Sequence, residues 1–201
     1  MKDNEKNLIE VNFEYKVSFE PTFNFYGFDL TDEVLKVIQE GQNLARTEPR
    51  KAIDRLPSLI LQYPQVSILK QHLALAYQSL GEGEQARFWN TKLVQEHPNY
   101  LFGRLSLAAD YLEKLNFQKV EDILGKHLEL FILYPERKIF HVTEVLAFQR
   151  IAALYFIFSG DIQTAEKRLE VMSSLAPKHP TTLEIADRVR QEYARLRRLQ
   201  K

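Results

Sequence analysis

The sequence predicts an all-α protein, built as a solenoid of antiparallel helix pairs behind a short extended N-terminal segment. Ala52, Ala86 and Val120 follow one another at intervals of 34 residues, and Pro64 and Pro98 are separated by the same interval. A period of this length is typical of a repeated pair of helices. The N-terminal part of the chain lacks this period and instead alternates apolar with polar residues, which favours a strand.

The composition fits one sizeable domain or a short solenoid. The chain has 201 residues, of which 45% are hydrophobic and 27% are charged, and a chain of this length buries roughly 70% of its unfolded surface. The 27 Lys and Arg residues balance 27 Asp and Glu residues, so no net charge attracts nucleic acid or an anionic membrane. Because the chain has no cysteine, disulfides, a thiol nucleophile and zinc–thiolate sites are excluded.

The sequence also bears on where the protein works. The opening residues Met-Lys-Asp-Asn-Glu-Lys-Asn are too polar for a signal peptide. The longest apolar run, Ile151 to Phe158, is shorter than the about 20 residues that span a bilayer. We therefore expect a soluble, cytoplasmic protein that makes no contact with a membrane.

The clearest copy of the repeat covers residues 67–98. Ala74 and Ala86 are small residues that let two antiparallel helices approach closely. Gly81 can adopt the left-handed conformation of a turn between helices, and Pro98 cannot continue a helix. The copy thus contains the features needed for one helix, a turn and a second helix.

This pattern of small residues and a closing proline resembles the tetratricopeptide repeat (TPR) family. The resemblance implies a solenoid that binds proteins or peptides and has no enzymatic activity. Asn90 departs from the family pattern, which usually has an aromatic or aliphatic residue there. The same phase gives a degenerate first copy, the clear second copy, a third copy with an insertion and a close fourth copy, over residues 33–64, 67–98, 101–142 and 146–177 of the repeat region 33–180.

The insertion in the third copy lengthens it by 11 residues, since Val120 and Ala165 are 45 residues apart. The extra residues fall between Gly125 and Thr143, and insertions in repeat proteins usually map to loops on one face, often the binding face. Long connections are often functional, but the apolar residues of this one could equally belong to the core. The candidate partner contacts in it are Glu136, Arg137, Lys138, Phe140 and His141.

The N-terminal segment, residues 1–32, carries an alternating pattern of apolar residues at Val11, Phe13, Tyr15, Val17 and Phe19, with Phe23 soon after. An isolated strand or hairpin is only marginally stable in water, so these side chains must lie against the helices, another chain or a ligand. We expect them to cover an open apolar end or groove of the solenoid.

The inner surface of the solenoid is the first place to look for a partner. In the TPR family it is lined by the first helix of each pair, and some members clamp a peptide carboxylate there with Lys, Asn and Arg. The matching positions here are mostly apolar, so that clamp is missing, and an apolar strand or helix should cover them, from a partner or from this chain. Candidate contacts on or near these helices are Gln71, His72, Gln78, Phe102 and Arg150.

The C-terminal segment, residues 181–201, has helical apolar spacing and is expected to cap the solenoid. Ala186 to Lys201 contains six basic and two acidic residues, whereas Met1 to Glu33 contains three basic and eight acidic ones, so the two ends could attract each other within or between chains. A solvated helix face explains the basic residues as well. The candidate basic patch consists of Arg188, Arg195, Arg197 and Arg198.

Nothing in the sequence predicts a catalytic site, a metal or a cofactor. The histidines lack zinc-ligand spacing, and His97 and His179 precede prolines at repeat ends, where they are expected in turns. Carboxylates are abundant, but none is expected to sit in an apolar stretch beside an obvious acid or base partner.

These observations predict a protein-interaction module or adaptor that binds an apolar strand or helix of a partner and could form homo-oligomers. The alternative is a chaperone or immunity-type protein that masks one segment of a client. A nucleic-acid-associated factor is the third interpretation and the weakest, because the arginines are not interleaved with aromatic residues and match no nucleic-acid motif.

Overall fold

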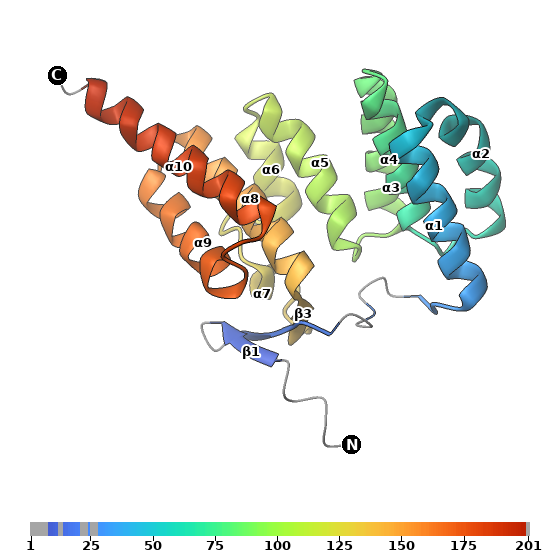
Figure 1. The fold of residues 1–201 in the computed structure, drawn as a ribbon, viewed down its shortest axis with the longest axis horizontal. Helices are drawn as coiled ribbons and strands as arrows, with labels where there is room; N and C mark the ends of the chain where they lie inside the picture. Colours follow the sequence, from blue (N-terminus) through green and yellow to red (C-terminus); the bar gives the residue numbers. More distant parts are fainter. Residues whose placement is uncertain (1–7, 12–13, 21–23, 25–27, 200–201) are drawn as a thin grey trace. The chain divides into compact units, whose positions relative to one another are not determined.

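The structure, a computed structural model, describes residues 8–11, 14–20, 24 and 28–199 (Figure 1). This part of the chain is mostly helical, and its helices pack in adjacent pairs, which confirms the all-α prediction. In chain order the elements are β1 (Leu8–Val11), β2 (Tyr15–Ser18), α1 (Asp32–Thr47), α2 (Pro49–Gln62), α3 (Ile68–Ser79), α4 (Gly83–Glu96), α5 (Leu101–Glu113), α6 (Phe117–Leu124), α7 (Leu130–Leu133), β3 (Ile139–His141), α8 (Val142–Ser159), α9 (Ile162–Leu175) and α10 (Pro180–Leu199).

The chain divides into two compact units. Residues Asn24–Leu107 form the first, which contains α1 to α4 and is called the helical unit below. Residues Met1–Phe23 and Ala108–Lys201 form the second, called the composite unit, because the N-terminal strands join the C-terminal helices in it. The N-terminal segment therefore packs with helices that are more than eighty residues away in sequence.

Local signals start and stop the helices of the helical unit. The Thr31 hydroxyl accepts a hydrogen bond from the Val34 N–H at 3.2 Å, which caps the N-terminus of α1. Pro49 starts α2, at a position where a helix needs no N–H donor. Gly81 lies between α3 and α4 with φ of 78°, a left-handed conformation that glycine adopts without strain.

The small residues that mark the 34-residue interval are all buried. Ala52 and Ala86 lie in α2 and α4 of the helical unit, and Val120 lies in α6 of the composite unit. Ala165, in α9, is completely buried as well. Because a small side chain at a buried position allows close helix contact, these residues set the spacing within their helix pairs.

Helix α8 forms the centre of the composite unit. Both α9 and α10 pack against it, and Phe148, Ala152 and Ala153 are completely buried. A helix that is apolar on nearly all sides is expected at such a place. By length and composition α8 is also the one helix among the described residues that could cross a membrane, and half of it is buried inside the unit.

A three-stranded sheet joins the two ends of the composite unit. Strands β1 and β2 form an antiparallel pair, and β2 pairs in parallel with β3, with Val17 opposite Phe140. Tyr15 and Val17 are buried and Lys16 is exposed, so the alternation seen in the sequence produces a two-faced strand. Phe13 and Phe23, which were expected to share this role, lie outside the described residues.

The third strand comes from the insertion that was expected between Gly125 and Thr143 as a loop. Instead, this segment contains the short helix α7 and strand β3. The N-terminal strands and the insertion, far apart in sequence, therefore complete one another. Whether the N-terminal segment covers an end or a groove of a solenoid stays a prediction.

We predict that Ala165→Leu lowers the stability of the composite unit by roughly 1–3 kcal/mol, because the added carbons overpack the contact between α8 and α9. Ala86→Leu should do the same in the helical unit. Urea unfolding followed by circular dichroism measures the change. Lys167→Leu, at an exposed position of α9, is the matched control; an Ala165→Leu midpoint equal to that of the control would show that Ala165 does not lie at a close helix contact.

Candidate functional site

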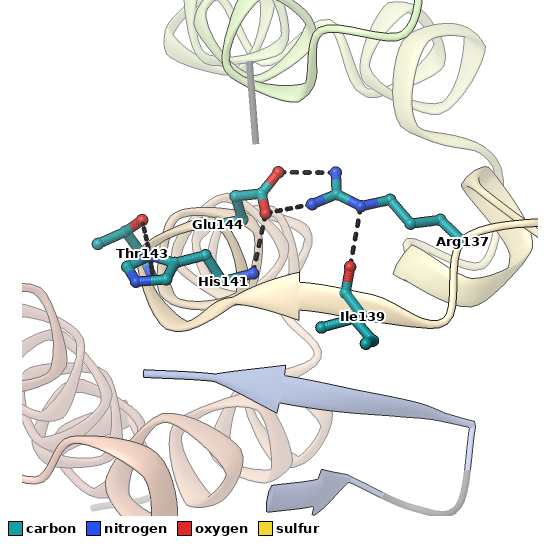
Figure 2. A network of polar contacts seen from close by, with 5 residues as sticks. All are labelled: Arg137, Ile139, His141, Thr143 and Glu144. Carbon is teal, nitrogen blue, oxygen red and sulfur yellow. Dashed lines mark hydrogen bonds and ion pairs between the residues drawn. The ribbon is translucent and has the colours of Figure 1, made fainter. Parts of the chain in front are cut away.

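The residues that join β3 to α8 form a polar network (Figure 2). The Arg137 guanidinium donates from Nη1 to Glu144 Oε1 at 2.8 Å and from Nη2 to Glu144 Oε2 at 2.5 Å. Its Nε donates to the carbonyl oxygen of Ile139 at 3.0 Å. Glu144 Oε2 also accepts the backbone N–H of His141 at 2.9 Å. One arginine and one carboxylate thus hold both ends of a three-residue strand.

The start of α8 explains why Glu144 lies there. His141 is the N-cap residue, and its ring Nδ1 accepts the N–H of Thr143 at 3.3 Å, while Glu144 turns back to the His141 N–H. This is a capping box, in which two N–H groups that the helix cannot pair internally gain side-chain partners. Partial burial lowers the pKa of the His141 imidazole, which favours the neutral ring that this acceptor role requires.

The Arg137–Glu144 ion pair is largely buried, so breaking it is expected to lower the free energy of unfolding. Glu144 is only 1% exposed, and the Arg137 side chain is 27% exposed. A buried carboxylate is costly without a partner, so the guanidinium offsets the cost of burying the Glu144 side chain. Arg137 also lies over the Phe140 ring, 4.3 Å from its centroid, and this adds a cation–π contact.

The structure brings three of the five candidate residues of the insertion together and leaves two at the surface. Arg137 and His141 belong to the network, and Phe140 is completely buried between Tyr15 and Tyr134, at centroid distances of 5.2 and 6.1 Å. Of the two explanations left open by the sequence, the core position applies to the Phe140 side chain. The exposed candidates are Glu136 and Lys138.

Glu144 was not among the residues predicted from the sequence. It is buried at the start of the apolar helix α8, where its partner is the Arg137 guanidinium. A glutamate three residues after an N-cap could have revealed it, but His141 is not one of the usual capping residues.

A second group of candidate residues lies in the helical unit. The Tyr100 hydroxyl donates to Gln71 Oε1 at 2.8 Å, and the Tyr100 and Phe102 rings lie 5.9 Å apart. Leu75 follows Gln71 by one helical turn and is 39% exposed. Gln71, Leu75 and Phe102 are at least partly exposed and are called the α3–α5 surface below, whereas Tyr100 is 5% exposed and holds Gln71 from the core. Gln78, another candidate, is exposed further along α3.

His72, also a candidate, is buried instead. It lies in α3 against α1, where a Cβ on Gly41 would come to 3.0 Å from the ring Nδ1, so a larger residue there would force the ring to shift. Among the described residues Nδ1 has no hydrogen-bond partner. Burial, with a smaller effect of the Arg46 charge, lowers the pKa of His72 to about 4. The ring is therefore neutral at pH 7.

An additional buried charge, not predicted from the sequence, lies two residues earlier in α3. The ammonium group of Lys70 lies 3.0 Å from Glu96 Oε2 and 3.1 Å from His97 Nε2. His97 follows the end of α4, as expected of a turn residue, but it also contacts this buried lysine. Desolvation and the Lys70 charge lower the pKa of His97. The group ties the start of α3 to the end of α4.

The candidate basic residues of α10 are partly paired. Arg188 lies 3.3 Å from Glu184, which also receives two hydrogen bonds from Arg150 of α8 at 2.8 and 2.9 Å. Arg195 lies 2.5 Å from Glu192 on its own helix. Arg197 and Arg198 are exposed in the last turn. Arg150 thus links two helices, and acids on α10 neutralise two of the four basic-patch residues.

Comparisons with known proteins add no further identification. No protein-family model matches the chain, and searches of curated proteins and of solved structures found no match. Within the residues that the structure describes, no group of three or more acidic or histidine side chains could hold a metal ion.

We predict that Arg137→Ala destabilises the composite unit by about 3–5 kcal/mol, because it leaves the buried Glu144 carboxylate without its counter-charge. Replacing both residues by leucine should cost less than this single change. Urea unfolding provides the measurement, and Glu136→Ala, at an exposed position of the same segment, is the control. Equal midpoints for Arg137→Ala and Glu136→Ala would contradict a role for the ion pair in the core.

We predict that acid destabilises the helical unit through His72. The unfolded chain takes up the His72 proton near pH 6.5 but the folded chain only near pH 4, so this contribution to stability is complete above about pH 6.5 and is lost as the pH falls toward 4. Between pH 7 and 5 the loss is about 2 kcal/mol.

Urea unfolding at both pH values tests this expectation, with His72→Gln as the variant that cannot titrate and His127→Gln, at an exposed histidine, as the control. The variant should lose about 2 kcal/mol less than the wild type on acidification. An identical pH dependence in the His72→Gln variant and the wild type would rule out His72 as the source.

Proposed function

We propose that this protein is a non-enzymatic interaction module of the TPR type, which binds an apolar strand or helix of a partner protein. The observation that carries this proposal is the α3–α5 surface, where apolar and polar side chains from the first helices of two expected repeats lie together. Leu75 is exposed one helical turn after Gln71, the Gln71 amide is fixed by the buried Tyr100, and the Phe102 ring lies 5.9 Å from the Tyr100 ring. Apolar and aromatic side chains around a positioned polar group are typical of protein interfaces.

A contact one repeat period apart supports the TPR type. Arg150 donates to Glu184, and the two residues are 34 positions apart. This contact links the fourth expected helix pair to the helix that follows it. The helix bounds also fall where the repeat phase expects them, with α3 and α4 inside 67–98 and α8 and α9 almost entirely inside 146–177.

The chemistry of the α3–α5 surface defines the partner. Leu75 and Phe102 offer apolar contact area, while Gln71 presents an amide whose oxygen is already fixed by Tyr100. No charged side chain is part of this surface, so recognition of a terminal carboxylate is not expected there. We expect the partner to place an apolar side chain on this surface and to make one backbone hydrogen bond with the Gln71 amide.

A photo-crosslinking amino acid at position 75 tests the proposal in the native cell. We expect crosslinks to a discrete protein, and we expect Phe102→Asp to suppress them by placing a charge in the apolar contact. Leu61, a leucine of α2 that is 83% exposed in the same unit, is the matched control position. Identical crosslink patterns at positions 75 and 61 would contradict the proposal.

The identity of the products separates the remaining interpretations. One stoichiometric product would favour a chaperone or immunity-type protein with a single client, and several weaker products would favour an adaptor. Crosslinks to nucleic acid instead of protein would overturn the proposed function.

A further inference from the structure

Strand β3 has two edges, and only one of them can accept another strand. The Lys16 N–H donates to the carbonyl of Lys138 at 2.9 Å, so in this parallel ladder the main-chain groups of residues 138 and 140 face β2. Those of Ile139 and His141 face the opposite edge, where Arg137 and Glu144 already occupy the Ile139 carbonyl and the His141 N–H. In Figure 2 this network lies along the edge of β3 that faces away from the two N-terminal strands.

The conformation of β3 is held by contacts within its own segment. Arg137, Glu144 and His141 hold it through the network, and the Lys138 ammonium donates to the Pro135 carbonyl at 3.0 Å. Tyr134 packs on the buried Phe140 ring from the same segment. None of these contacts involves the N-terminal strands. The edge that faces β2 is therefore organised in advance, which lowers the entropic cost of binding an extended chain.

Strand β2 shows what kind of chain this edge accepts. Tyr15 packs edge-on against Phe140 at 5.2 Å, and Val17 is completely buried. Ser18 is buried as well, while Glu14 and Lys16 are exposed. The pattern is an aromatic residue, an exposed residue, an aliphatic residue and a small residue.

We propose that β3 and α8 form a preformed docking site for an extended peptide strand, which β2 fills in this structure and which a strand of the same pattern from a partner protein can fill in its place. The partner strand runs parallel to β3 and pairs with its main chain, while its aromatic and aliphatic side chains enter the Tyr15 and Val17 positions. This is recognition by strand addition. The site is separate from the α3–α5 surface, so it stands or falls independently of the proposed function.

The experiment uses the full chain carrying Val17→Asp, which places a charge at a completely buried position and undocks β2. A fluorescent peptide with the sequence of residues 8–20 is the probe. We expect saturable binding to the Val17→Asp chain, with a Kd at least tenfold lower than for the wild-type chain, where the tethered strand competes at high effective concentration.

Two peptide variants test specificity. The peptide carrying Val17→Asp should show no saturable binding, and the peptide carrying Glu14→Ala, changed at an exposed position, should bind like the wild type. Circular dichroism of the Val17→Asp chain should retain the wild-type helix content. Loss of the helices would show that β2 is an integral part of the core and would overturn the proposal, as would a folded variant that does not bind the peptide.

The register provides an independent check, because the chain contains no cysteine of its own. Lys16 lies opposite Ile139, and both are exposed. The chain carrying Val17→Asp and Ile139→Cys should form a disulfide with a peptide carrying Lys16→Cys, and should do so much more slowly with a peptide carrying Glu14→Cys. Equal rates, or equal affinity of the peptide for wild-type and variant chains, would mean that it binds elsewhere.

Discussion

The burial of the Glu144 carboxylate is the constraint on which the composite unit depends. A charge that is 1% exposed must be paired, and the pairing group, Arg137, comes from the segment before β3. Because the same carboxylate caps α8 and the same guanidinium binds the Ile139 carbonyl, strand and helix form one rigid piece. Strand β2 pairs with the edge of β3 that this network leaves open. The orientation of β3 therefore determines where β2 lies and that Tyr15 and Val17 are buried.

The helical unit buries two ionisable side chains of α3, Lys70 and His72, in different environments. Lys70 lies within 3.1 Å of both a carboxylate and an imidazole, so its ammonium is compensated. His72, two residues later on α3, has no partner for Nδ1 among the described residues and is kept neutral by burial. The His72 ring packs closely against Gly41 of α1. One helix thus combines a paired charge, which is costly to break, with an unpaired ring, which is costly to protonate.

Much of the fold can be predicted from the sequence, because the helices depend on local signals. Gly81 supplies a left-handed turn, Pro49 starts a helix, and small residues at a 34-residue interval mark helix contacts; each of these effects acts within a few residues of its cause. The alternation around Tyr15 predicts a two-faced strand for the same reason. Of the polar network, the sequence singled out Arg137 and His141 as candidate partner contacts but not Glu144.

The rest depends on contacts between distant parts of the chain. Val17 pairs with Phe140 although the two residues are far apart in sequence. No sequence pattern predicts this pairing, because a parallel ladder can form between any two suitable strands. For the same reason the sequence could not decide whether Phe140 faces a partner or the core, nor that His72 would be buried. By itself the sequence determined the helices, their turns and the two-faced strand. Only the tertiary structure decided what each apolar face covers, because burial is a property of the assembled chain.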